Sequence, residues 1–597
     1  MMRKRTQTSV SAAVIAVILL CGPVRAELDK TKYISIDEVK VGMEAYALTV
    51  LYGTAIEKFP VKVLSVVRNK EPGSDMILVV VTDERFKNTG AIHGCSGSSV
   101  FIDGRLAGAL AAGWDGSVEP LYLVRPIEDM LAVGTAPKAS ASGAATAGRL
   151  ALDLSGPLDL AAVYEQAAAA MTRQHTGTAM PLATSLPAEV CRSLADSFEM
   201  MGVRPLSGAI AGSADGETID VPIERGGVLA AVLCSGDINL AAVGTVTEVV
   251  GEKVYGFGHS FTGIGGVEFP MAAGTVHTVV AGYDYSFKLA SPGPVLGTIQ
   301  FDQNAAISGQ IGVSPAMVPM RVTIERYNDP QTRTYNCRLA YDRDYTPMIG
   351  RLVASSAATM LGDLPPEHTL RYRGRIAARG QEAIVFENCS SGRSVAEMGM
   401  EIFSALTLML NNPFEQVVPE EIELAIVIEP EDSTAAIWSA RLSQAAVKPG
   451  QTIAVEVTLQ SFRAARTTCT VEVTIPETMP PGKYPLQVMG VAAYTNFVNQ
   501  NAPHRFRVVD AGTLVAGLNR VMNVPRNRLY AVLPVPSTGL AFRRHELPDL
   551  PPTRMMLMQD AKRLEPVVPY NSWVENSVPL EKIVTGGAQI ELTVEQP

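Results

Sequence analysis

Short runs rich in Val, Ile and Leu, several of them separated by glycine-containing turns, recur along this 597-residue chain. Residues 61–67 and 76–82 are two such runs. Asp103-Gly104 and Gly251-Glu252 each separate two further runs, as the turn of a tight hairpin does. Aromatic residues make up only 6% of the chain, whereas Val, Thr and Gly are abundant. This pattern predicts a mainly β protein.

The chain is too long for one hydrophobic core, so we expect three or four domains. The longer helical stretches are few, and we predict them at residues 160–173, 187–201, 346–361 and 394–410; shorter helices are expected at 126–131 and early in the tail region. Helices are therefore expected as additions to β units rather than as the framework of the protein.

The N-terminus carries the features of a secretory signal peptide in residues 1–26. Arg3, Lys4 and Arg5 precede an apolar run, and small residues follow near a cleavage point. The run is shorter than the ~20 residues that span a membrane. We therefore expect an exported protein, in the periplasm, the cell envelope or outside the cell. The alternative is an uncleaved N-terminal anchor, which would be its means of membrane association.

Charge and side-chain chemistry exclude several classes of partner. The net charge of −10, without a Lys/Arg cluster beyond the first residues, argues against a nucleic-acid partner. The seven His form neither an HExxH motif nor a Cys/His metal spacing, so we expect no metal, and no organic cofactor is implied. Widely spaced Cys without a CxxC pair are expected to be mostly buried thiols: Cys95, Cys191, Cys234, Cys337, Cys389 and Cys469.

Two distant segments carry the residue types of a nucleophilic serine site. Thr82-Asp83 leads into Gly94-Cys95-Ser96-Gly97-Ser98, and Gly256-Phe257-Gly258-His259 follows far along the chain. A serine becomes a useful nucleophile when an imidazole takes its proton, and the imidazole needs a carboxylate to hold its tautomer. Small residues around Ser96 let the backbone approach a substrate carbonyl and direct amides toward it.

Neighbouring residues leave alternatives open. His93 lies three positions before Ser96 and is a second candidate for the base. Asp237 lies in a Ser-Gly-Asp turn and competes with Asp83 for the role of the acid. Cys95 is interpreted as structural, because no separate base favours it as a nucleophile over Ser96.

These residues and others around them resemble the SpoIVB peptidase family. The resemblance covers roughly residues 33–312, about half of the chain. The stretches that carry it are Gly42-Met43-Glu44-Ala45-Tyr46, Ser65-Val66-Val67, Thr82-Asp83, Gly94-Cys95-Ser96-Gly97-Ser98, Ile102-Asp103-Gly104, Pro126-Ile127-Glu128-Asp129-Met130-Leu131, Gly244-Thr245-Val246-Thr247 and Gly256-Phe257-Gly258-His259.

The resemblance implies a chymotrypsin-like serine peptidase, built on two β barrels with the site between them. It assigns Ser96 as the nucleophile, His259 as the general base and Asp83 as the orienting acid. By analogy with the chymotrypsin-like arrangement, the backbone amides of Gly94 and Ser96 form the oxyanion hole.

The chain departs from the family pattern in order and in two turn residues. The sporulation enzyme of the family has His before Asp and Ser, whereas here Asp83 and Ser96 precede His259. A triad is defined by geometry, so rearranged halves still assemble one site. The family commonly has Met before the nucleophile and Pro closing the turn, where this chain has Cys95 and Ser99. Ser99 removes a rigid turn residue, which is expected to loosen the loop.

Short strands punctuated by Pro-Gly turns in the later part of the chain predict an immunoglobulin-like β sandwich. The resulting division is a signal peptide at 1–26, the Asp/Ser half of the peptidase region at 33–135, a linker at 136–155, the His half at 156–330, an α+β segment at 331–421, the sandwich at 422–510 and a C-terminal tail region at 511–597.

Two functions follow from this reading. The first is a secreted serine endopeptidase whose substrate is a protein or peptide, either another chain or itself. The second is a non-catalytic envelope scaffold or binding protein, with a degenerate peptidase domain and an immunoglobulin-like module. The placement of Ser96 relative to His259 discriminates between them, because a wide separation with no loop motion to join them would favour the scaffold.

Overall fold

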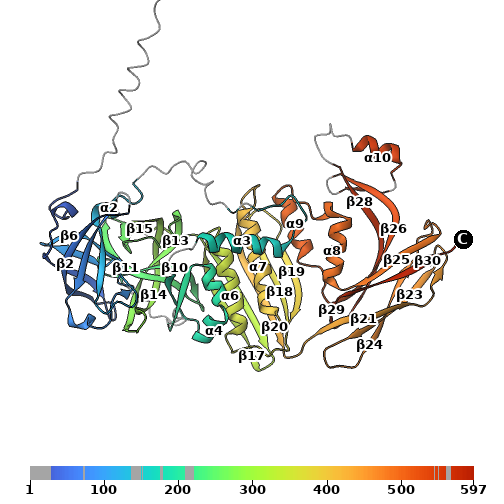
Figure 1. Ribbon diagram of the computed structural model, residues 1–597, viewed down its shortest axis with the longest axis horizontal. Helices are drawn as coiled ribbons and strands as arrows, with labels where there is room; N and C mark the ends of the chain where they lie inside the picture. The colour runs from blue at the N-terminus through green and yellow to red at the C-terminus, as the bar shows by residue number, and fades with distance from the viewer. Residues whose placement is uncertain are drawn as a thin grey trace, which may run out of the picture.

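The computed structural model describes residues 28–71, 74–135, 150, 152–174, 179–208, 221–542, 545–548, 550–559 and 567–596. The protein is mainly β, with its strands gathered in a closed barrel and several sheets. Figure 1 shows these units following one another along the long axis, from the N-terminal barrel to the C-terminal sheets. The predicted signal peptide and most of the predicted linker lie outside the described residues.

The first unit is a closed barrel that contains most of the predicted Asp/Ser half. In order around the barrel, its strands are β1 (Glu44–Val50), β2 (Ile56–Glu71), β3 (Ser74–Val81), β7 (Leu121–Pro126), β6 (Arg105–Ala112) and β5 (Ser99–Ile102). Phe59, Val61 and Val79 fill its interior, since alternate residues of a strand point to the same side. The predicted hairpin at Asp103-Gly104 joins β5 to β6, with φ angles of 51° and 77°.

The second unit is a ring of strands within a larger 14-stranded sheet. In ring order, the strands are β10 (Val228–Gly236), β11 (Leu240–Val250), β12 (Lys253–Gly256), β15 (Ala306–Ile311), β14 (Ser286–Gln303) and β13 (Gly265–Val280). The ring closes because β10 pairs with both β11 and β13. The predicted hairpin at Gly251-Glu252 joins β11 to β12, with Gly251 at a φ of 62°.

The two units meet along a segment that connects β3 to β5. Within it, β4 (Ile92–His93) pairs in parallel with β14 of the ring. A second link is an isolated antiparallel bridge between Gly53 and Val276. Ser96 follows β4 after two residues, so the chain path places it at the junction of the two units.

The 14-stranded sheet continues past the ring into an α+β unit. β17 (Asp329–Ala340) pairs with β10, and four more strands follow in the order β16 (Met317–Arg326), β20 (Pro419–Glu429), β18 (Thr369–Ala378) and β19 (Ile384–Ser391). Their apolar side chains share one core with those of nearby helices. Figure 1 shows these helices lying beside the strands.

The helices agree with three of the four predicted stretches. They are α3 (Leu160–Gln174), α6 (Tyr345–Thr359) and α7 (Ser394–Asn411). The stretch at 187–201 is instead two short helices, α4 (Ala188–Ser193) and α5 (Ala195–Met200). The break falls at Leu194, whose φ of −111° and ψ of 21° are not helical.

The C-terminal unit consists of two sheets that share a core containing Val455, Val473, Leu486 and Leu592. One sheet has the order β24-β23-β21-β29, and the other includes β22, β30, β25, β26, β27 and β28. Their bounds are β21 (Thr434–Leu442), β22 (Ala446–Val447), β23 (Thr452–Gln460), β24 (Thr467–Thr474), β25 (Gly482–Met489), β26 (Arg528–Phe542), β27 (His545–Leu547), β28 (Val567–Pro579), β29 (Ile583–Thr585) and β30 (Gly587–Val594).

The region predicted as a tail at 511–597 therefore supplies a large share of this unit. It begins with helix α9 (Ala511–Val521), and its strands complete both sheets. The immunoglobulin-like sandwich at 422–510 stays a prediction, because the two sheets form only with strands that lie beyond its expected end.

Candidate active site

Ser96 lies in a tight turn between β4 and β5, which we call the serine turn (residues 94–98). Gly94 and Gly97 have φ angles of 92° and 94°, which glycine adopts without steric cost. A Cβ at Gly97 would lie 1.9 Å from the carbonyl oxygen of Thr245, so a side chain there forces the backbones apart. The serine turn thus lies directly against β11 of the ring.

Hydrogen bonds from both units hold the serine turn. The Gly97 amide donates to the Leu110 carbonyl of the barrel at 2.7 Å. The Thr245 amide of the ring donates to the Ser96 carbonyl at 2.8 Å, and the Thr247 hydroxyl donates to the Gly97 carbonyl at 2.8 Å. The position of Ser96 therefore depends on the docking of the two units.

Ser99, which stands where the family pattern has Pro, makes a contact to the ring. Its buried hydroxyl donates to the Thr247 carbonyl at 2.8 Å and lies 3.3 Å from the Val246 carbonyl. Within the turn, the Ser98 hydroxyl donates to the Cys95 carbonyl at 2.6 Å. These hydrogen bonds hold the turn in place and so compensate for the rigidity that a Pro at this position would supply.

The hydroxyl and the backbone amide of Ser96 are both available to a substrate. Its side chain is partly exposed, and neither its hydroxyl nor its amide has a hydrogen-bond partner among the residues that the structure describes. An oxyanion hole needs amides that remain available in this way. Gly94, the second predicted donor, is buried against Lys288, and its carbonyl accepts from the Thr245 hydroxyl at 3.0 Å.

His259 lies on the turn that follows β12, which we call the histidine turn (residues 257–263). Phe257 and Gly258 are both left-handed, with φ angles of 66° and 72°, so the chain reverses sharply before His259. The Phe257 amide donates to the Thr245 carbonyl at 3.3 Å. A Cβ at Gly258 would lie 3.2 Å from the Leu110 carbonyl oxygen.

The two turns therefore meet at the same two groups. Thr245 donates its amide to the serine turn and accepts at its carbonyl from the histidine turn. The Leu110 carbonyl likewise accepts from the serine turn, and it lies so close behind Gly258 of the histidine turn that a Cβ there would meet it at 3.2 Å. No hydrogen bond joins Ser96 Oγ to His259 in the described part of the chain. The structure thus holds the serine turn and the histidine turn against the same two residues, while the side chains of Ser96 and His259 share no hydrogen bond.

The imidazole of His259 is in the form that a general base requires. Its Nδ1 lies 2.7 Å from the Ser260 carbonyl, which can only accept, so Nδ1 carries the proton and Nε2 has a free lone pair. Burial lowers the pKa of His259 below its usual 6.5. The charge of Asp302 acts in the opposite direction, whereas Arg125 and His93 add to the lowering of this pKa.

The structure gives Asp83 a different partner from the one that the resemblance implies. Its carboxylate caps a short 3-10 helix (Glu84–Phe86) and accepts from the Arg85 amide at 2.9 Å. The same carboxylate accepts from Arg85 Nε and Nη2 at 3.1 and 2.9 Å, and Arg85 also bonds Glu57. Hydrogen bonds from Arg85 hold the pKa of Asp83 below its ordinary value. In the part of the chain that the structure describes, Asp83 bonds no imidazole.

His93, the alternative base, is half-buried and is paired with a carboxylate. Its Nε2 lies 2.8 Å from Asp115 Oδ1, and its ring meets Tyr285 edge-on at 5.9 Å. Asp237, the alternative acid, accepts from the Asn336 amide at 2.6 Å and stabilises a turn beside β17.

Residues 24–114 match the SpoIVB peptidase S55 family. The matched segment includes the barrel strands β1, β2 and β3 and the serine turn, but it ends before the histidine turn. No curated protein and no solved structure matches the chain. The match indicates a peptidase, and therefore a hydrolase.

Behind the serine turn lies a buried amine, that of Lys288, which the sequence analysis did not identify. Lys288 Nζ donates to Thr49 Oγ1 at 2.6 Å and to Thr245 Oγ1 at 3.3 Å, and it contacts the Cys95 thiol. No carboxylate pairs with it among the described residues. Burial lowers the pKa of Lys288 and raises that of Cys95. The available signal in the sequence was a lysine among apolar residues near the start of what is strand β14.

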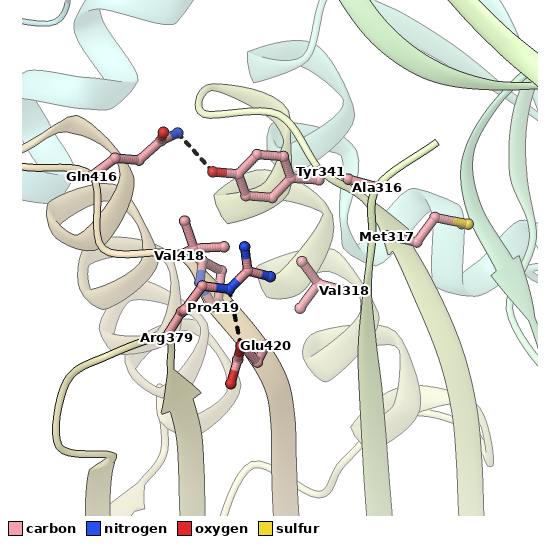
Figure 2. A pocket seen from close by; sticks show the side chains of 9 residues that line it. All are labelled: Ala316, Met317, Val318, Tyr341, Arg379, Gln416, Val418, Pro419 and Glu420. Atoms are coloured by element: carbon pink, nitrogen blue, oxygen red, sulfur yellow. Dashed lines mark hydrogen bonds and ion pairs between the residues drawn. The ribbon is translucent and has the colours of Figure 1, made fainter. Parts of the chain in front are cut away.

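A cavity of about 380 Å³ lies elsewhere, where the first residues of β16 and β20 splay apart (Figure 2). Arg379 pairs with Glu420 at 3.0 Å across its wall, and Gln416 donates to Tyr341 at 2.6 Å. None of its lining residues belongs to the serine or histidine turn.

The described residues contain no group of three or more His, Cys, Asp or Glu side chains placed to hold a metal ion. Among the same residues, no helix has the length and apolar character to cross a membrane.

Proposed function

We propose that this protein is a serine peptidase in which Ser96 is the nucleophile and His259 the general base. The observation that carries the proposal is the meeting of the serine turn and the histidine turn at Thr245 and Leu110. Two segments with the residues of a nucleophile and a base, far apart in sequence, are held against each other by the fold. The peptidase family match to the first segment agrees with this reading.

The chemistry follows from the available groups. Ser96 Oγ attacks a peptide carbonyl while its proton passes to His259 Nε2, whose lone pair is free. The oxyanion then faces the unpaired Ser96 amide, with Gly94 as the second donor. The imidazolium gives its proton to the departing amine, and water releases the acyl group by the same route. The absent side-chain contact closes when substrate binds, since such hydrogen bonds are often long in free enzymes.

The arrangement of strands supports the chymotrypsin-like part of the proposal. A closed barrel precedes the junction, and the ring of β10 to β15 follows it. The serine turn comes from the first unit and the histidine turn from the second, as expected of a site between two barrels. Because Asp83 and Ser96 precede His259 here, whereas His comes first in the sporulation enzyme, the proposed site is one assembled from exchanged halves.

We further propose that the protein acts outside the cytoplasm as an endopeptidase. The basic residues and apolar run at the N-terminus favour export. The substrate is then an exported protein or peptide, or the chain itself.

Labelling by a serine-directed fluorophosphonate tests the proposal. The wild-type protein is expected to gain one adduct on Ser96, and Ser96→Ala is expected to gain none. Ser98→Ala is the matched control, because it removes a hydroxyl from the same turn that is buried and bonded to Cys95. Undiminished labelling of Ser96→Ala refutes the assignment.

A second candidate is the non-catalytic scaffold. Two observations favour it: Ser96 and His259 share no hydrogen bond, and Asp83 is bonded to Arg85 rather than to an imidazole. A well-folded wild-type protein that neither reacts with the fluorophosphonate nor cleaves any peptide would establish this second function.

A further inference from the structure

Asp302 is a buried carboxylate at the end of β14, directly behind the histidine turn. Its Oδ1 accepts from the Phe261 amide at 2.7 Å. Its Oδ2 accepts from the Thr262 amide at 2.5 Å, from the Thr262 hydroxyl at 2.5 Å and from the Gly263 amide at 2.9 Å. Every one of these donors belongs to the histidine turn, so one carboxylate organises the chain that immediately follows His259.

The constraint passes from this turn to the imidazole. His259 Nδ1 donates to the carbonyl of Ser260, the residue between His259 and the first amide that Asp302 accepts. The direction of that carbonyl depends on the path of residues 260–263. Phe261 holds the same path from the other side, since its ring packs against Phe269 with centroids 6.1 Å apart. Asp302 thus acts on His259 through the backbone, without touching the ring.

The charged groups that face His259 come from several elements. Asp302 favours the protonated ring, whereas Arg125 on β7 and His93 on β4 disfavour it. Arg125 is itself fixed beside the histidine turn, because its Nε contacts the Gly258 carbonyl at 3.4 Å and its guanidinium bonds Ser74. Of Asp302, Arg125 and His93, only Asp302 carries a negative charge that stabilises the protonated imidazole of His259.

We propose that Asp302 is the acidic positioning residue of this site, which fixes the tautomer of His259 through the histidine turn and stabilises the imidazolium formed during the reaction. The resemblance to the SpoIVB peptidase family assigns this role of orienting acid to Asp83. The inference rests on the proposed serine-peptidase function for its catalytic meaning. The effect of the Asp302 carboxylate on the tautomer and the pKa of His259 can be measured without catalysis.

The role differs from that of a structural turn anchor in one respect. An anchor needs only the hydrogen bonds, so its loss would weaken the turn and leave the charge on His259 unaffected. A positioning acid also supplies charge, so its neutralisation makes the imidazolium less stable. Thr262→Ala separates the two effects, because it removes one donor to Asp302 and retains the carboxylate.

The test follows the titration of His259 by NMR in protein with isotope-labelled histidine, in a Ser96→Ala background that cannot react. Asp302→Asn is expected to lower the pKa of His259 and to reduce the population of the Nδ1-protonated tautomer. Thr262→Ala is expected to keep the titration of the parent. His259→Gln identifies the resonance among the seven His of the chain.

The same substitutions in the reactive protein give the catalytic readout. Asp302→Asn is expected to slow fluorophosphonate labelling by about 10²-fold or more, because loss of the acid in a triad costs up to ~10⁴ in rate. Thr262→Ala is expected to stay within about tenfold, since it removes one hydrogen bond to Asp302 and keeps both the carboxylate charge and the three amide donors that hold it. Asp83→Asn, measured in parallel, tests the alternative that Asp83 is the orienting acid.

Each outcome decides the inference. An unchanged titration of His259 in Asp302→Asn overturns it, as does a larger effect of Asp83→Asn on either readout. If Asp302→Asn does not fold, the wild-type tautomer decides, because a neutral His259 protonated mainly at Nε2 contradicts the positioning role. A titration that responds to Asp302→Asn in a protein that never reacts would refute the peptidase and retain the control of His259 by Asp302.

Discussion

Gly97→Ala is the substitution with the most direct consequence for this site. Alanine at a left-handed φ of 94° costs roughly 1–2 kcal/mol by itself. The new Cβ would also lie 1.9 Å from the Thr245 carbonyl oxygen, well inside van der Waals contact, so the serine turn must move off β11 by more than an ångström. That movement breaks the bond from the Thr245 amide to the Ser96 carbonyl and the bond from the Thr247 hydroxyl to the Gly97 carbonyl.

The expected loss of stability is about 3–4 kcal/mol, because each broken hydrogen bond adds about 1 kcal/mol to the backbone cost. Activity is expected to suffer more than stability, since a displacement of ~1 Å in a catalytic group can lower the rate by about 10²-fold. Urea unfolding measures the first effect, and the rate of fluorophosphonate labelling measures the second.

Gly104→Ala is the matched control. Gly104 is also left-handed, with a φ of 77°, but its hairpin is open and a Cβ there meets nothing within 4 Å. It should lose only about 1–2 kcal/mol and keep its labelling rate. If Gly97→Ala is as mild as Gly104→Ala in both assays, the serine turn is not held against β11 as described.

Three further predictions concern the titratable groups. His259→Gln should lower the labelling rate by at least about 10²-fold, and a larger loss in His93→Gln would transfer the base to His93. Because burial lowers the pKa of His259, fluorophosphonate labelling of Ser96 should persist below pH 6.5. The free energy of unfolding should fall as the pH drops from 6.5 toward the pKa of His259 in the folded protein, since only the unfolded chain takes up a proton in that range. Burial lowers the pKa of Lys288, so the free energy of unfolding should rise with pH between the pKa of Lys288 in the folded protein and 10.5. Urea unfolding at about pH 8 and about pH 10 measures this rise, and Lys288→Met should abolish it.

The strands that sequence could predict are those with a strong local signal. The runs at 61–67 and 76–82 fall in β2 and β3, and the turn residues at Asp103-Gly104 fix a hairpin because few other pairs accept two positive φ angles. Strands after residue 510 escaped prediction. β26 contains prolines and an interrupted register between Pro534 and Thr538, features that normally argue against a strand.

In the site, sequence patterns could indicate Ser96 and His259, because glycine-rich turns mark both. Asp302 carries no such pattern. It reaches the histidine turn only through the register that sets Gly265 opposite Asp302 on neighbouring strands, and register is a property of the folded sheet. The partner of Asp83, in contrast, lies two residues away at Arg85, so a local signal for its ion pair was present in the sequence.

A crystal structure of the protein after reaction with a fluorophosphonate tests the central claim most directly. We expect a phosphonyl group on Ser96 Oγ, with an oxygen of that group against the Ser96 amide and His259 Nε2 within ~2.6–3.2 Å of the adduct. An adduct on another residue, or an imidazole of His259 turned away from a phosphonylated Ser96, would contradict it.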